Sequence, residues 1–386
     1  MTRCSTMRVL MTRFLAGVLL VFGLGHAHAA EERTREPFEI MRMITASQDR
    51  LQDRRGLDQK GLAAEQRALS TDFIDAARGD PKIWQNPRNR RALALFLLSG
   101  GDGAPLRQVV AAIAVEGDER KILDGALAFA EAREKQALTA LDGLEPRNLP
   151  VELAGQVALT LGVLNLTVDR AKAMTAFDYA RLLSPGALVE EAALRRQVFL
   201  ASEGTDVARF VALSERYRAR FPHSVYVDNF ELKFREGFIK FWIERDDDAR
   251  ATLENALVDA PRQAANVLLF DTVRKSFEKR ALAAAARAAR RAKANMDAND
   301  PDQRRAMLYE FAANIFEQAP TLDQIMALDA VRLSLEDRIL QESLSIVVAG
   351  LRPKPDNAPA QAGEPTPPMK KAQDLLAQAA AWDQRS

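Results

Sequence analysis

Prolines recur at nearly even intervals along the middle of this 386-residue chain, and this spacing is the feature that most constrains its fold. The series is Pro105, Pro146, Pro185, Pro222, Pro261 and Pro301, with separations of 41, 39, 37, 39 and 40 residues. Each interval has room for two helices and a turn, because proline ends one helix and is tolerated in the first turn of the next. A period of about 40 residues built from paired helices is typical of a helical solenoid. Chance is the alternative, since other prolines, such as Pro150 and Pro320, fall off the period.

The residues between these prolines favour helix. Long stretches are rich in Ala, Leu, Arg, Glu and Gln, which are strong helix formers, and no run of alternating β-branched residues indicates a sheet. We therefore predict an all-α fold, a tetratricopeptide-like helical-hairpin solenoid with a proline-rich C-terminal tail. The expected layout is a signal peptide at 1–29, an N-terminal helical region at 30–103, the helical-repeat solenoid at 104–350, a proline-rich linker at 351–371 and a short amphipathic tail at 372–386.

The clearest hairpin runs over 168–199. Its first helix carries one apolar face at helical spacing, formed by Ala173, Ala176, Phe177, Ala180 and Leu183. The chain breaks at 184–186, Ser-Pro-Gly, and a second helix is expected to turn Leu188, Ala192, Leu194 and Val198 inward. The next hairpin is predicted as a helix over 207–220, a turn at 221–224, and a helix from Val225 that Ser224 caps.

An aromatic stripe follows on that last helix. Aromatic residues recur at steps of about four, at Tyr226, Phe230, Phe234, Phe238, Phe241 and Trp242. We interpret the stripe as buried core, with an exposed groove for a partner helix as the alternative.

Charged segments have structural interpretations. The helix expected over 281–295 carries Arg287, Arg290, Arg291 and Lys293, which we interpret as a solvated basic face, with a patch for an acidic partner as the weaker reading. The acidic stretches at 244–248 and 297–302 lack the glycine turn and distal Glu of a calcium loop. We expect them to stabilise helix N-termini instead.

The first thirty residues resemble a secretory signal. Arg3, Arg8 and Arg13 precede an apolar run at 14–25, and Ala-His-Ala at 27–29 fits a cleavage site. The run of about 12 apolar residues is short for a bilayer span, which needs about 20. We expect export and cleavage near Ala29, leaving no membrane span; an uncleaved anchor is the alternative.

Cleavage would remove the one cysteine and two of the three histidines. Cys4, His26 and His28 all lie in that segment, so His223 would be the sole remaining imidazole. This excludes cysteine nucleophiles, disulfides and metal sites with several histidine ligands, and we expect no cofactor. Loss of three arginines leaves 51 basic against 53 acidic residues, which gives no case for nucleic acid as a partner.

Enzyme motifs are missing from the sequence. There is no phosphate-binding P-loop, no nucleophile elbow and no His-Glu-x-x-His zinc motif. Glu342-Ser343 matches the pair that opens the catalytic domain of soluble lytic transglycosylases, where a glutamate of raised pKa acts as the acid. The residues that follow do not continue that pattern, so we expect no enzymatic activity.

One predicted helix carries a group of charged residues that are candidates for binding a partner. Our candidates are Glu190, Glu191, Arg195 and Arg196, which form charged pairs at i,i+4 and i,i+5 on what we expect to be the exposed side of their helix. Ordinary intrahelical ion pairing, worth about 0.2–0.5 kcal/mol per pair, is the simpler interpretation.

Several segments together resemble the MotC family of periplasmic motility proteins. They are EPFEIMR at 36–42, LQD at 51–53, WQNPRN at 84–89, LSGG at 98–101, AFDYARLLSPG at 176–186, EEAALRR at 190–196 and RFPHS at 220–224. The resemblance extends from Pro37 to about Trp242 and does not include the proline-rich tail.

This resemblance implies a non-catalytic role in the periplasm. It implies that the chain binds the periplasmic part of the stator subunit MotB and is needed for flagellar rotation. It also allows a dedicated periplasmic chaperone as a second partner. The alternative is a general periplasmic tetratricopeptide-like scaffold for envelope or peptidoglycan assembly.

Overall fold

The computed structural model describes residues 35–351, apart from 259, 298, 301 and 329–332. These residues form helices, short 3₁₀ turns and loops, and no strand occurs among them, so the predicted all-α class is confirmed. The expected signal peptide at 1–29, the rest of the linker after Leu351 and the tail at 372–386 lie outside the described residues.

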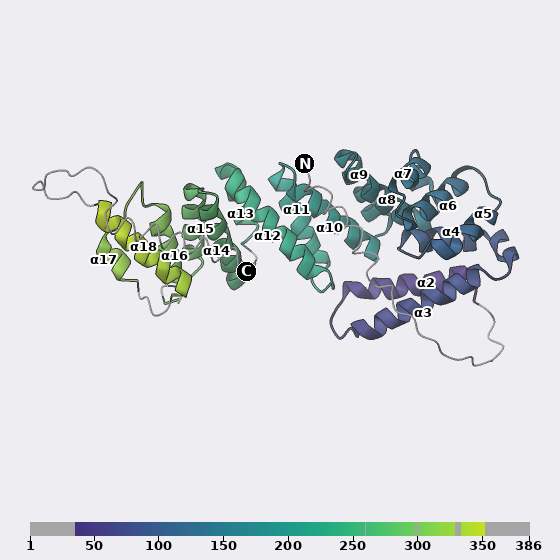
Figure 1. The fold of residues 1–386 in the computed structure, drawn as a ribbon, viewed down its shortest axis with the longest axis horizontal. Helices are drawn as coiled ribbons and strands as arrows, with labels where there is room; N and C mark the ends of the chain where they lie inside the picture. The colour runs from purple at the N-terminus through teal and green to yellow at the C-terminus, as the bar shows by residue number, and fades with distance from the viewer. Residues whose placement is uncertain (1–34, 259, 298, 301, 329–332, 352–386) are drawn as a thin grey trace, which may run out of the picture. The chain divides into compact units, whose positions relative to one another are not determined.

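The chain divides into two compact units, both built of helices where the structure describes them (Figure 1). Unit 1 is Met1–Phe234 and unit 2 is Arg235–Ser386. The division falls inside helix α12, Val227–Glu244. The boundary that we expected between 103 and 104 stays a prediction, although one apolar cluster of unit 1 takes residues from both sides of it, from Ile40 to Leu164.

Unit 1 begins with two helices that pack on each other and continues as a series of further helices. Its elements before α12 are α2 (Pro37–Asp49), η1 (Arg50–Gln52), α3 (Gln59–Ala77), η2 (Pro81–Gln85), α4 (Pro87–Leu98), η3 (Ala104–Leu106), α5 (Arg107–Ala112), α6 (Gly117–Ala130), α7 (Glu134–Leu141), η4 (Pro146–Asn148), α8 (Val151–Asn165), α9 (Arg170–Leu183), α10 (Leu188–Ser202) and α11 (Val207–Arg220). Helix α2 packs on α3 and α4, α8 packs on α9, and α10 packs on both α9 and α11.

In unit 2, as in unit 1, most helices pack on the helices that precede or follow them in the sequence. After α12 it contains α13 (Asp247–Asn255), α14 (Arg262–Glu278), α15 (Leu282–Ala294), α16 (Gln303–Ala313), α17 (Leu322–Met326) and α18 (Leu335–Leu351). Helix α15 packs between α14 and α16, and α18 packs on α16 and α17.

The periodic prolines separate helices as the sequence predicts. Pro105 lies in η3, Pro146 opens η4, Pro185 lies between α9 and α10, Pro222 lies between α11 and α12, and Pro261 is the N-cap of α14. Two α-helices lie in each of four intervals, 146–185, 185–222, 222–261 and 261–301, whereas 105–146 contains three. Pro301 lies outside the described residues. The paired helices fit a tetratricopeptide-like solenoid, which itself stays a prediction.

Side chains just before several helices fix where those helices begin. The Asp169 carboxylate accepts hydrogen bonds from the backbone N–H groups of Ala171 and Lys172, and so caps α9. Asp246 accepts from the Ala249 N–H at 2.9 Å, so the predicted capping role of the 244–248 acidic stretch is confirmed there. Asp302, before α16, makes no such side-chain bond.

Close helix packing in unit 1 depends on glycine and alanine. Gly155 and Gly162 lie one above the other on α8, seven residues apart. A Cβ at Gly162 would overlap the ring of Phe177, and one at Gly155 would overlap Ser184. The α8 and α9 backbones approach closely because these positions lack side chains.

The N-terminal pair is tied to the later hairpins by backbone hydrogen bonds. The Arg54 N–H donates to the His223 carbonyl at 2.7 Å, and the Val225 N–H donates to the Leu51 carbonyl at 3.0 Å. The Asp49 carboxylate also accepts from the Leu188 N–H at 2.8 Å. The 49–54 segment is therefore fixed to the α10 N-terminus and to the turn between α11 and α12.

Five of the six aromatic residues of the stripe are core, as predicted, whereas Tyr226 is half-buried. Phe230 and Phe234 are fully or almost fully buried in unit 1, where Phe230 stacks on Tyr217 with ring centroids 4.0 Å apart. In unit 2, Phe238, Phe241 and Trp242 are fully buried, and the Trp242 indole N–H donates to the Ala284 carbonyl.

The basic helix α15 differs from the expected solvated face. Arg287 pairs with Glu254 and Asp247, and Lys293 pairs with Glu310, while Arg290 is exposed. The opposite side of α15 consists of buried alanines, which lets α14 and α16 approach it closely.

Candidate partner-binding surface

The predicted quartet lies on α10, but not on an exposed side. Glu190 and Glu191 are buried, at 6 % and 0 % exposure, and Arg195 and Arg196 are half-buried. The expected exposure was therefore wrong, because Glu190, Glu191 and Arg195 contact residues of α11 and of the turn after it, which the helical spacing of α10 does not reveal. A role of these four residues in partner binding stays a prediction.

Glu191 is the acceptor at the centre of a buried polar cluster. Its Oε1 accepts from the Tyr217 hydroxyl of α11 at 2.8 Å and from the Ser224 hydroxyl of the following turn. Ser224 Oγ in turn accepts from the Tyr226 N–H at 3.0 Å, a bond within the turn before α12 and not the predicted cap of a helix that starts at Val225. Burial raises the pKa of Glu191, and burial together with the Glu191 charge raises the pKa of Tyr217.

The arginines of the quartet complete this cluster. The Arg195 guanidinium lies over the Tyr226 ring, 4.1 Å from its centroid. Arg196 donates to the Ala192 carbonyl, and burial lowers its pKa to about 10. Glu191 Oε2 and Arg195 Nη1 are both buried and have no hydrogen-bond partner among the described residues.

Glu190 closes the loop between α9 and α10. One of its oxygens accepts from the Gly186 N–H and from the Arg220 guanidinium, each at 2.7 Å. Gly186 has φ of +80°, a conformation that favours glycine, so the loop geometry and the buried carboxylate depend on each other. The Glu190 and Glu191 contacts are structural, because both residues are committed to holding α10 against its neighbours.

A basic face lies across α9, α10 and α11, and sequence reasoning missed it. We define the basic face by Arg181 of α9 and by Arg209, Arg216 and Arg220 of α11, with the carboxylates Asp178 and Glu190 among them. Arg209, Arg216 and Arg220 are seven and four residues apart, which places them on one side of α11. That spacing was visible in the sequence, but it does not show which α9 residues lie beside them.

Arg181 is held in place at the centre of the basic face. Its Nη1 donates to Gln197 Oε1 at 2.8 Å and to Asp178 at 3.2 Å, and its side chain is 13 % exposed. Burial, and next the charge of Arg216, lower the pKa of Arg181; Arg220 acts in the same direction. The arginines of the two helices are thus close enough to repel one another.

The outer arginines are more accessible. Arg209 and Arg220 are each 46 % exposed; Arg209 lies 3.8 Å from Asp178, and Arg220 is paired with Glu190. Arg216 is exposed and makes no hydrogen bond or ion pair with any residue in the described part of unit 1. Three guanidinium groups therefore share two carboxylates, Arg216 pairs with neither, and the face carries excess positive charge.

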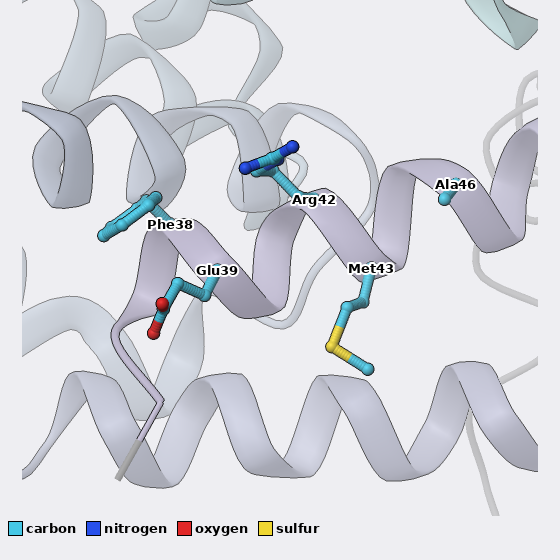
Figure 2. Close-up of a pocket in the computed structure, with 5 residues that line it drawn as sticks. All are labelled: Phe38, Glu39, Arg42, Met43 and Ala46. Atoms are coloured by element: carbon cyan, nitrogen blue, oxygen red, sulfur yellow. The ribbon is translucent and has the colours of Figure 1, made fainter. Parts of the chain in front are cut away.

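A shallow depression on α2 is a second surface feature (Figure 2). Figure 2 shows Phe38 and Arg42 pointing to one side of the helix and Glu39 and Met43 to the other, with Ala46 farther along. Glu39 is engaged in the helix cap, because it accepts from the Glu36 N–H at 2.9 Å. The lining mixes a carboxylate, a guanidinium and apolar groups, and so specifies no ligand class.

The remaining sequence candidates do not come together. His223 is exposed in its turn, and Glu342 is exposed on α18 of unit 2. Ser343 donates its hydroxyl to the Ile339 carbonyl of its own helix. Within residues 35–351, as far as they are described, no group of three or more His, Cys, Asp or Glu residues is placed to hold a metal ion.

Comparison with known proteins decides the family. The model of the family described as "Chemotaxis protein MotC" matches residues 2–386. The chain belongs to the MotC family. A "Chemotaxis protein MotC" from Rhizobium meliloti (strain 1021) is 27 % identical over 360 residues, which cover 90 % of this chain and 79 % of that protein. No solved structure matches.

This MotC family member is therefore a motility and chemotaxis protein of the flagellar motor class. The family is one of motility accessory proteins, and the predicted resemblance is confirmed. No helix among the described residues of this MotC protein is both long and apolar enough to cross a membrane.

Proposed function

We propose that this protein acts in the periplasm, where it binds the periplasmic part of the stator subunit MotB and is needed for flagellar rotation. The observation that supports it is the family match, which extends over nearly the whole chain and not over one hairpin alone. The predicted signal at the N-terminus would deliver the chain to the compartment where it meets that partner.

The mechanism is binding and not catalysis. Packed helical hairpins present extended surfaces to a protein partner. Contact with the stator would favour one stator conformation only by the difference in affinity between the two states. The protein would then act as a ligand of the motor, and its removal would leave the flagellar filament intact.

The test is swimming in a clean deletion strain, with stained filaments counted in the same cells. Paralysed cells with a normal number of filaments, restored by the wild-type gene, are the expected result. Normal swimming would contradict the proposal. An envelope defect together with normal swimming would favour the general envelope scaffold.

A further inference from the structure

The basic face of unit 1 has a geometry suited to carboxylates. Its arginines come from two helices that flank α10, and the carboxylates paired with them are Asp178 and Glu190. Glu190 is buried, at 8 % side-chain exposure, and is already bonded to Arg220 and to the Gly186 N–H. An arriving anion would therefore meet guanidinium groups without a strong competing charge from Glu190.

Arg216 is the most available of these groups. It is exposed, and in the described part of unit 1 it has no hydrogen bond or ion pair to give up when a partner arrives. Its neighbour Arg181 is fixed by Gln197 and Asp178, so little side-chain entropy is lost when it contacts a ligand. A guanidinium offers two parallel N–H donors to a carboxylate, which makes arginine well suited to this contact.

We propose that the basic face formed by Arg181, Arg209, Arg216 and Arg220 is the docking surface for an acidic segment of the protein partner. Charge complementarity is the argument for this occupant: the face has four cations and two anions, and one cation is unpaired. Asp or Glu side chains of the partner would pair with Arg216. They would also contact Arg209 and Arg220, which already pair with Asp178 and Glu190. The inference rests on the proposed function, since the partner is the periplasmic domain of MotB.

Arg216→Glu tests the proposal with little risk to the fold. The side chain makes no hydrogen bond or ion pair with described residues that the change would break, and its reversal places a negative charge where an acidic segment should bind. Arg216→Gln removes the charge without reversing it. Arg67→Glu is the matched control, because Arg67 is an exposed arginine on α3 with no side-chain ion pair among the described residues of unit 1.

The measurement is the affinity of the full chain for the purified periplasmic domain of MotB, at low and at high salt. We expect Arg216→Glu to weaken binding about tenfold or more, Arg216→Gln to weaken it less, and Arg67→Glu to leave it within about twofold. The difference should shrink at about 0.5 M salt, because exposed charges are screened there. Thermal unfolding of each variant checks that the fold is retained.

Three other results would each contradict a different part of the proposal. Binding by the wild type that Arg216→Glu and Arg67→Glu weaken equally would overturn the basic face and leave the proposed function in place. No binding by the wild type would overturn the named partner, and this inference with it. Binding to purified peptidoglycan that only Arg216→Glu abolishes, without binding to MotB, would assign the face to a cell-wall polymer and also overturn the proposal.

Discussion

At the scale of single residues, Glu191 is the acceptor on which a buried polar cluster depends. Two buried hydroxyls, those of Tyr217 and Ser224, donate to its Oε1. Glu191→Ala would leave both donors without an acceptor and open a cavity, so we expect a loss of about 2–4 kcal/mol in the free energy of unfolding. Urea unfolding followed by circular dichroism measures it. Glu215→Ala, an exposed change on α11, is the control and should cost no more than about 0.5 kcal/mol; equal losses would show that the cluster contributes nothing special.

The raised pKa of Glu191 also predicts a pH dependence. Burial raises this pKa above 4.5, the value of an unperturbed glutamate. The contribution of the group to stability is therefore complete below about pH 4.5 and is lost as pH rises through the folded-state pKa, because the ionised form is disfavoured in the buried site. Tyr217 and Tyr226 do not titrate in this window, since burial raises their pKa values as well.

Glu191→Gln isolates this effect. Glutamine keeps an acceptor oxygen for the two hydroxyls and does not ionise. Between about pH 4 and about pH 8 we expect the wild type to lose unfolding free energy relative to Glu191→Gln. Unfolding curves of both proteins at each pH provide the measurement, and parallel pH profiles would rule out Glu191 as the titrating group.

At the scale of helices, the α8–α9 contact depends on Gly162. Alanine normally improves an exposed helix by up to about 1 kcal/mol over glycine. At Gly162, however, the added Cβ would overlap the fully buried ring of Phe177, so we expect Gly162→Ala to lower the unfolding free energy by about 1–3 kcal/mol. Gly350→Ala on α18 is the matched control, because a Cβ there meets nothing within 4 Å and should be neutral or stabilising. Thermal unfolding distinguishes the two, and a stabilised Gly162→Ala would show that α9 moves to accommodate the methyl group.

Helix positions were well predicted because their signals are local. The helix expected at 207–220 is α11, Val207–Arg220, and the break expected at 184–186 separates α9 from α10. The helix expected from Val225 begins two residues later, at Val227, because Ser224 Oγ accepts the Tyr226 N–H in the turn. Apolar spacing, proline and capping residues act over one or two turns of chain and can be read from sequence.

At the scale of the whole molecule, contacts between distant segments could not be predicted. The spacing of Glu190 and Glu191 on α10 suggested exposure, but the residues that bury them, such as Tyr217 and Arg220, lie 26 and 30 residues away. The Arg54–His223 backbone bond, between segments 169 residues apart, depends on how the hairpins stack. The basic face has the same origin, since Arg181 and Arg216 meet only after α9 and α11 both pack on α10.

The proposed role in the motor requires that the whole chain be exported. Leu19→Arg with Leu20→Arg would place two charges in the apolar run at 14–25, and charged residues are costly in a segment that must enter a membrane. We expect this variant to remain full-length in the cytoplasmic fraction and to leave a deletion strain unable to swim. Leu19→Val with Leu20→Val keeps the run apolar and is the control, which should be processed to begin near Ala30 and restore swimming. Cell fractionation with N-terminal sequencing gives both readouts. If the arginine variant restored swimming, the protein would act inside the cell. If the valine control restored swimming while it stayed membrane-bound and unprocessed, the uncleaved anchor would be favoured.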